Sequence, residues 1–154
     1  MSLTASEHAE LSALLSVGLA MLLGGAIGLE REASDKPAGL RTHMLVAGAA
    51  ALVVALSDVM VQRFNTGLSA QLVRSDPVRV MEAVITGVSF LGAGTIIRRG
   101  AERQVEGLTT AASLLFTAAV GVCVALSQIL LAIGVTVIVL ITLRVVGEVA
   151  GRLR

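Results

Sequence analysis

The sequence predicts an all-α membrane protein whose chain crosses the bilayer about five times. Hydrophobic residues make up 55% of the chain and charged residues only 15%, whereas soluble domains carry about a quarter charged residues. Five segments approach the length of about 20 mostly apolar residues that a helix needs to cross about 30 Å of hydrocarbon. Arginine and lysine also gather in the connections on one side. The lipid bilayer is therefore the expected solvent of this chain.

The expected spans lie near 11–29, 42–61, 77–97, 108–126 and 129–146. The last two are separated only by the region around Ser127 and Gln128, so one long bent helix is the alternative there. Acidic residues rather than Lys or Arg precede the first segment, which argues against a cleavable signal peptide. We expect the whole chain, 1–154, to form a single transmembrane domain.

Positively charged residues indicate the orientation, because Lys and Arg in short connections are retained on the cytoplasmic side. With five spans, one side receives nine such residues and the other three. The nine are Arg31, Lys36, Arg41, Arg98, Arg99, Arg103, Arg144, Arg152 and Arg154, and the three are Arg63, Arg74 and Arg79. The sequence therefore predicts an external N-terminus and a cytoplasmic C-terminus.

Small residues recur every four positions in four of the predicted spans, which places each set on one face of a helix. Such stripes let helix backbones approach closely in lipid. We expect them to pack the bundle internally, and homodimerisation through one stripe is the alternative. The sets are Ala20, Gly24 and Gly28; Ala47, Ala51 and Ala55; Ala83 and Gly87; and Thr117, Gly121 and Ala125.

An internal repeat is indicated by matches at an offset of 68 residues. "LGGAIGLERE" from Leu23 resembles "LGAGTIIRRG" from Leu91, and "GLRT" from Gly39 resembles "GLTT" from Gly107. Each unit, about 11–57 and about 79–125, would hold two spans and one cytoplasmic turn. Two parallel repeats of this kind are known in transporters. We therefore expect a four-helix core of two repeats plus a fifth helix at about 129–146.

The repeat brings the cytoplasmic ends of the core together, where a vestibule lined by glycines and ringed by polar groups is expected. Arg41 runs straight into the second span, so its guanidinium should reach the interface or the carboxylate of Glu30. Threonines can cap the exposed N–H groups of the outgoing helices. The candidate functional residues here are Glu30, Arg31, Arg41, Thr42, Gly92, Gly94, Arg98, Arg99, Thr109 and Thr110.

Two acidic candidates lie at the other side of the predicted membrane. Asp76 before Pro77 is typical of a helix start, with a capping carboxylate followed by a residue favoured in the first turn. Glu82 falls within two turns of the start of the third span. Its carboxylate would either pair with Arg79 or belong to a proton or cation pathway.

Several function classes are disfavoured by the sequence. A net charge of +1 argues against nucleic-acid binding, for which a clustered basic face is expected. No pairing of nucleophile and base, metal-ligand cluster or phosphate loop indicates an enzyme or a bound cofactor. Carboxylates suited to magnesium exist in Glu30, Glu32 and Asp35, but no spacing marks them as ligands.

Three segments together resemble the signature of the MgtC/SapB family of bacterial inner-membrane proteins: "GAIGLEREASDKPAGLRTHMLV", "DPVRVMEAVITGVSFLGAGTIIRRG" and "VEGLTTAASLLFTAAVG". The resemblance implies an inner-membrane location and a role in growth at low magnesium, virulence, survival in macrophages and acid resistance. It also implies regulation of other membrane machines, such as the ATP synthase. The matching positions are Gly28, Glu30, Arg31, Lys36, Pro37, Gly39, Leu40, Arg41, Thr42, His43, Asp76, Pro77, Gly92, Gly94, Gly107, Thr109 and Thr110.

The chain departs from the family pattern in two ways. Full-length members resembling the founding protein carry a soluble C-terminal domain, for which this sequence has no counterpart, and Glu82 stands where glutamine is expected in many relatives. Our first hypothesis is a regulator of membrane partners under low-magnesium, acid or host stress. The alternative is a transporter or channel for magnesium or another cation with a pathway at the repeat interface. A continuous polar cavity from Glu82 or Asp76 to Arg41 would favour transport, and a dry centre would favour regulation.

Overall fold

Five α-helices form a bundle in the part of the chain that the computed structural model describes, residues 5–65, 77–99 and 104–146. The predicted helices are thereby confirmed, whereas the short strands between the third and fourth were not predicted. The strands pair antiparallel, with Ile97 opposite Glu106. In chain order the elements are α1 (Ala5–Ala33), α2 (Leu40–Asn65), α3 (Pro77–Gly94), β1 (Ile97–Arg99), β2 (Gln104–Glu106), α4 (Leu108–Ala125), α5 (Ile129–Ile141) and a π-helical turn, Thr142–Val146.

By length and composition, three of the described helices could cross a membrane: Ser6–Ala33, Leu40–Val61 and Leu108–Ala125. A shorter apolar helix covers Ile129–Val145. The third predicted span, near 77–97, corresponds to α3, whose 18 residues include Arg79 and Glu82. A helix of that length is about 27 Å long, which is close to the hydrocarbon thickness.

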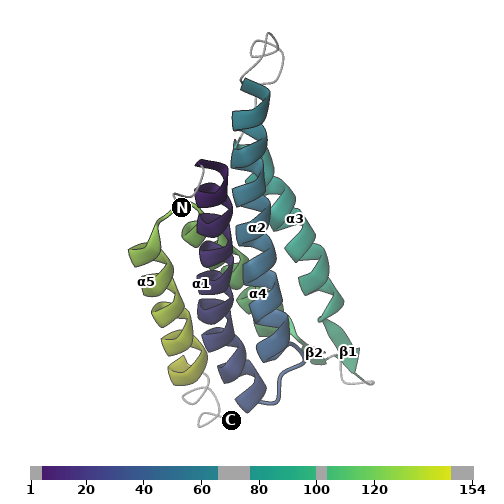
Figure 1. Ribbon diagram of the computed structural model, residues 1–154. Coiled ribbons are helices and arrows are strands. Elements are labelled where there is room, and N and C mark those ends of the chain that lie inside the picture. Colours follow the sequence, from purple (N-terminus) through teal and green to yellow (C-terminus); the bar gives the residue numbers. More distant parts are fainter. Residues whose placement is uncertain (1–4, 66–76, 100–103, 147–154) are drawn as a thin grey trace.

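The bundle has α2 and α4 at its centre (Figure 1). α1 packs against both of them, α5 packs against α4 and α1, and α3 packs against α4 and, less extensively, α2. The α1–α2 turn and the β1–β2 hairpin lie at the same end (Figure 1), which we call the hairpin end. Two parallel repeats would also place α2 and α4 as a central pair, with α1 beside α2 and α3 beside α4. The repeat itself stays a prediction.

Two turns fix where helices begin and end. Both "GL.T" sequences start a helix at their leucine, Leu40 for α2 and Leu108 for α4. Gly107 has a φ of 92°, and a Cβ there would overlap the carbonyl oxygen of Thr95, so only glycine fits. The alternative of one long bent helix over α4 and α5 is wrong, because Ser127 takes a φ of 59° between them.

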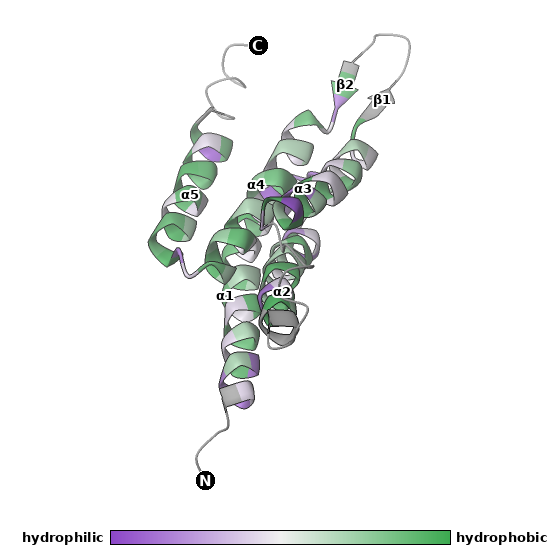
Figure 2. Ribbon diagram, turned by 90° about the horizontal axis from the view of Figure 1, so that it is seen from above, coloured by the Kyte–Doolittle hydropathy of each residue, from purple (hydrophilic) through white to green (hydrophobic). Residues whose placement is uncertain are grey.

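The small-residue stripes of α1, α2 and α4 meet in the centre of the bundle. Ala20, Ala47 and Ala51 are fully buried there with Val120. Large hydrophobic residues are also exposed on each of the five helices, and most of the helical ribbon is hydrophobic in Figure 2, which is what a lipid-facing surface requires. The stripe of α3 differs, because Ala83 and Gly87 are exposed. Internal packing therefore accounts for three of the four stripes.

Candidate functional site

The last turn of α1 carries a buried ion pair between consecutive residues. Arg31 Nε donates to Glu30 Oε2 at 2.5 Å, and Arg31 Nη2 donates to Glu30 Oε1 at 2.7 Å. Ser34 Oγ donates to the same Oε1 at 3.0 Å. The side chains of Glu30 and Arg31 are only 7% and 4% exposed, respectively. A two-pronged contact of this kind fixes both groups and cancels their charges inside the protein.

The α1–α2 turn lies close to the end of α1 because glycines remove side-chain bulk. A Cβ on Gly28 would lie 2.7 Å from Leu40 Cα, and one on Gly39 would lie 2.8 Å from Glu32 Oε2. Glu32 Oε2 in turn accepts a hydrogen bond of 2.9 Å from the backbone N–H of Leu40, at the start of α2. Glu32 thus caps α2 across the turn.

His43, one turn into α2, is fully buried and bonds in two directions. Its Nδ1 lies 3.0 Å from the carbonyl oxygen of Gly39, and because a carbonyl only accepts, Nδ1 carries the hydrogen of that bond. Its Nε2 lies 3.0 Å from Ser113 Oγ on α4, 70 residues away in sequence. Ser113 Oγ also lies 2.8 Å from the carbonyl oxygen of Thr110. A single side chain therefore links the start of α2 to the core of α4.

Further buried polar groups continue this region toward the middle of α4. Thr117 is fully buried, and its Oγ1 donates to the carbonyl oxygen of Ser113 at 2.8 Å. Hydroxyl groups that bond back to their own helix in this way need no water. We call the buried polar residues at the hairpin end the polar cluster, namely Glu30, Arg31, His43, Thr110, Ser113 and Thr117.

Next to the polar cluster the backbones of α1, α2 and α4 come into close contact. A Cβ on Gly24 of α1 would lie 2.7 Å from both Ala47 Cβ and the carbonyl oxygen of His43 on α2. A Cβ on Gly121 of α4 would overlap the carbonyl oxygen of Ala47. The contact surface between α1, α2 and α4 is therefore closed and apolar at this level, and we call it the closed layer.

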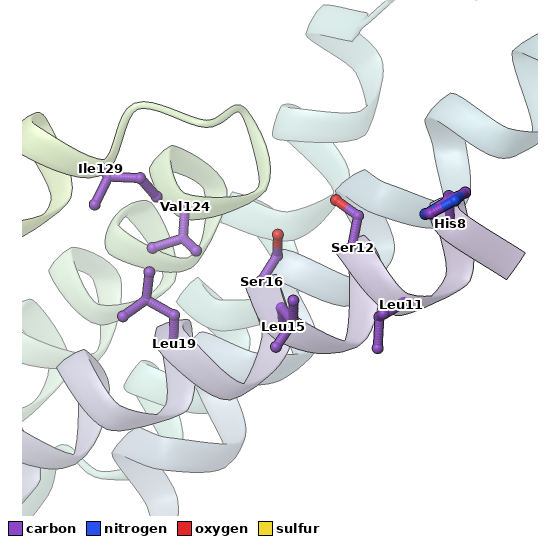
Figure 3. A pocket seen from close by; sticks show the side chains of 8 residues that line it. All are labelled: His8, Leu11, Ser12, Leu15, Ser16, Leu19, Val124 and Ile129. Atoms are coloured by element: carbon purple, nitrogen blue, oxygen red, sulfur yellow. The ribbon is translucent and has the colours of Figure 1, made fainter. Parts of the chain in front are cut away.

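A cavity of about 770 Å³ lies on the other side of the closed layer, at the end opposite the hairpin. Residues of α1, α2, α3 and α4 line it, mostly apolar ones. The polar lining includes Ser12, Ser16, Ser57, Asp58 and Arg79. A second, more open pocket of about 340 Å³ lies beside α1, where His8, Ser12 and Ser16 share the wall with leucines and with Val124 and Ile129 (Figure 3).

The predicted site residues do not all come together. Glu30 and Arg31 are buried as a pair, and Thr110 is buried beside Ser113. Of the two alternatives for Arg41, the pairing with Glu30 is not formed, because Glu30 bonds to Arg31 and Ser34 instead. Arg41 is exposed, and its placement at the membrane interface stays a prediction. Thr42 is half-buried and Thr109 is exposed.

The remaining predicted residues lie apart from the polar cluster. Gly92 is buried against Ala111, where a Cβ would lie 3.3 Å away, whereas Gly94 is exposed with open space beside it. Glu82 is exposed. Arg98 and Arg99 belong to β1, their side chains lie outside the described part, and Asp76 lies outside the described residues.

His43 and Ser113 belong to the site but were not among the sequence candidates. The usable signal was the position of His43 four residues after Gly39, in the turn motif "GLRTH". For a metal, no group of three or more His, Cys, Asp or Glu side chains comes together within the described ranges. Of the carboxylates considered for magnesium, Glu30 is held by Arg31 and Glu32 caps α2, while Asp35 is exposed.

Comparison with known proteins places the chain in a family. The model of the MgtC family matches residues 17–152. The chain is 40% identical over 135 residues to "Putative magnesium transporter YhiD" of Escherichia coli strain K12, covering 88% of this chain and 60% of that protein. It is 38% identical over 141 residues to "Protein MgtC" of Salmonella typhimurium strain LT2, covering 91% of this chain and 54% of that protein.

An uncharacterized protein of Haemophilus influenzae is 34% identical over 126 residues, or 82% of this chain and 52% of that protein. The chain thus spans between about half and three fifths of the length of these relatives. No solved structure matches it. The family match covers nearly the whole bundle, including the α1–α2 turn, the polar cluster and the closed layer. The chain belongs to the MgtC family.

Proposed function

We propose that this protein regulates membrane partners during adaptation to low magnesium, acid or host stress, and that it is neither an enzyme nor itself a transporter. The closed layer is the observation that carries this proposal. At Gly24 and Gly121 the backbones of α1, α2 and α4 leave no room even for a methyl group. An ion path along the centre would require these helices to separate.

The polar cluster supports the same reading. Within the polar cluster Arg31 donates to Glu30. His43 is bonded to the carbonyl oxygen of Gly39 and to Ser113 Oγ. Groups satisfied in this way position helices rather than coordinate a passing ion. The partner would be an inner-membrane protein, with ATP synthase as the candidate that the family resemblance supplies. The hairpin end would face the cytoplasm.

A cellular experiment separates regulation from transport. A strain that lacks its own MgtC-family proteins is grown at limiting magnesium with and without this protein, and its magnesium uptake rate is followed with an intracellular indicator. Regulation predicts restored growth with an unchanged initial uptake rate. Growth that is restored in proportion to a raised uptake rate contradicts the proposal.

Cation transport is the second candidate, and the four-helix cavity favours it. The cavity has a volume of about 770 Å³, and both Asp58 and Arg79 line it. The name of the Escherichia coli relative, "Putative magnesium transporter YhiD", points the same way. Under this alternative, Asp58→Asn should abolish the raised uptake in the same strain while Ser57→Ala leaves it unchanged.

A further inference from the structure

Helix α3 uses only one face to pack against the bundle. Val84 and Gly92 are buried and Val88 is half-buried, while most other positions are exposed. Phe90 is 84% exposed, one of the most exposed large side chains in the described part of the chain. Among the residues that the structure describes, the opposite face of α3 is therefore left without a partner.

That free face is polar, although it lies in a helix flanked by apolar membrane spans. Arg79, Glu82, Thr86 and Ser89 are all exposed. Within the described ranges, Glu82 and Arg79 form no ion pair, so the structural role expected for this pair is not met inside one chain. Ionisable side chains inside a membrane are costly and normally face protein or water. Lipid is therefore a poor neighbour for this face.

The spacing of the free face matches a helix-pairing seam. Five positions of α3, separated alternately by four and three residues, lie along one line of the helix opposite Val84 and Gly92. This spacing averages 3.5 residues, which is the period at which two helices pack side by side. Small and polar residues dominate this line, which is what association in lipid favours. We call this line the α3 seam, and it comprises Arg79, Ala83, Thr86, Phe90 and Ala93.

The glycines next to the α3 seam are not needed for close packing within one chain. A Cβ added to Gly87 or Gly94 would meet no atom within 4 Å. Gly24 and Gly121, in contrast, admit close contacts between helices of the same bundle. Residues without side chains, placed beside a seam in open space, allow another helix to approach.

We propose that the α3 seam pairs with the α3 seam of a second copy of this chain, in a parallel dimer with its twofold axis along the membrane normal. Insertion gives every copy the same orientation, so equal residues meet at equal depth. Arg79, which also lines the four-helix cavity, is one turn from Glu82. The guanidinium of each copy reaches the carboxylate of the other, which offsets the repulsion between the two Arg79 side chains. The two Thr86 hydroxyls face each other near the middle. This inference does not rest on the proposed regulatory function.

Cysteine cross-linking tests the contact directly in native membranes. Cys123 is the single cysteine of the chain, so Cys123→Ala provides a background for single cysteines at Ala83, Thr86 and Phe90. Ile85 and Leu91 are exposed positions of α3 off the seam and serve as matched controls, and Leu130, 86% exposed on α5, controls for random collisions. A disulfide forms only when two Cα atoms come within about 7 Å.

The dimer predicts that oxidation cross-links the seam positions several-fold more than Ile85, Leu91 and Leu130. Equal yields at seam and control positions overturn the proposal. Cross-links from the seam to a different protein, without self-cross-links, also overturn it and identify another partner for α3.

Charge reversal in two separately tagged copies tests the complementarity. Copies with Glu82→Arg carry only positive charges at the end of the seam, and copies with Arg79→Glu carry only negative ones. Each variant should lose self-association, while a mixture of the two should form heterodimers at wild-type yield or above. Unaltered self-association of both variants, or no preference for the mixed pair, contradicts the dimer. As a milder change, Thr86→Val should weaken dimerisation about threefold, as expected for one interhelical hydrogen bond in a membrane.

Discussion

His43 and Ser113 join the central helices α2 and α4 through a buried hydrogen bond of 3.0 Å between Nε2 and Oγ. On its other side the same imidazole bonds to the carbonyl oxygen of Gly39, 3.0 Å away at the start of α2. The α1–α2 turn is thereby tied to the middle of the bundle.

Removal of the Ser113 hydroxyl should destabilise the bundle. Ser113→Ala leaves the buried Nε2 of His43 without its partner, which costs about 1–3 kcal/mol for an unsatisfied buried group. The exposed Thr109, on the same helix, provides the control, and Thr109→Ala should change stability by less than about 0.5 kcal/mol. Thermal unfolding of the purified protein in detergent measures both. Equal stability of the two variants would show that the bond contributes nothing.

The closed layer predicts a strong difference between two glycines. Gly121→Ala places a methyl group onto the carbonyl oxygen of Ala47, so α2 and α4 must move apart. We expect a loss of about 1–3 kcal/mol, as for overpacked cores. Gly134→Ala on α5 is the matched control, because a Cβ there meets no atom within 4 Å; it should be neutral or stabilise by up to about 1 kcal/mol. Indistinguishable unfolding temperatures for the two variants would argue against the close packing of α2 on α4.

The ion pair of α1 predicts unequal roles for two nearby arginines. Arg31→Ala removes both guanidinium bonds and leaves the buried carboxylate of Glu30 with Ser34 alone, at a cost of about 3–5 kcal/mol. Arg41→Ala removes an exposed charge and should leave stability within about 0.5 kcal/mol. Abundance in membranes and unfolding in detergent report both effects.

A double variant sharpens this test. Glu30→Leu combined with Arg31→Leu removes both charges together and should recover most of the stability lost in Arg31→Ala, since a buried charge no longer lacks its counterion. Arg41→Ala provides a separate test of function. If this variant is present in membranes at normal abundance but no longer supports growth at low magnesium, the Arg41 guanidinium acts on a partner. A double variant less stable than Arg31→Ala would contradict the ion-pair account.

The turn into α4 depends on one glycine. Gly107→Ala puts a Cβ on a left-handed residue, costing about 1–2 kcal/mol, and onto the carbonyl oxygen of Thr95 as well. Gly94→Ala, in open space near the end of α3, should lose no stability. Limited proteolysis between α3 and α4 measures the difference. Equal cleavage rates for both variants would mean that the turn is not constrained in this way.

The helices and their turns could be predicted from the sequence because these features are local. Apolar runs of membrane length located the helices, the two "GL.T" sequences marked their starts at Leu40 and Leu108, and Ser127 with Gln128 marked the break before α5. The small-residue stripes also indicated which faces could pack closely.

The partners of the polar groups could not be predicted in the same way. Glu30 pairs with the adjacent Arg31 because both side chains turn toward the bundle, although neighbouring helix residues normally point apart. The bond between His43 and Ser113 joins residues 70 positions apart and depends on the rotation of two helices. Glu82 likewise points outward because α3 packs on α4 with its opposite face. The sequence pattern of α3 alone does not determine which face packs against the bundle.

Magnesium flux into liposomes tests the closed layer most directly. Purified protein is reconstituted into vesicles that enclose a magnesium indicator. Protein-free vesicles are the negative control, and vesicles with an established magnesium channel are the positive control. With α1, α2 and α4 in contact at Gly24 and Gly121, influx should equal that of protein-free vesicles. Saturable, selective influx that Asp58→Asn abolishes would contradict the account and establish the protein as a transporter.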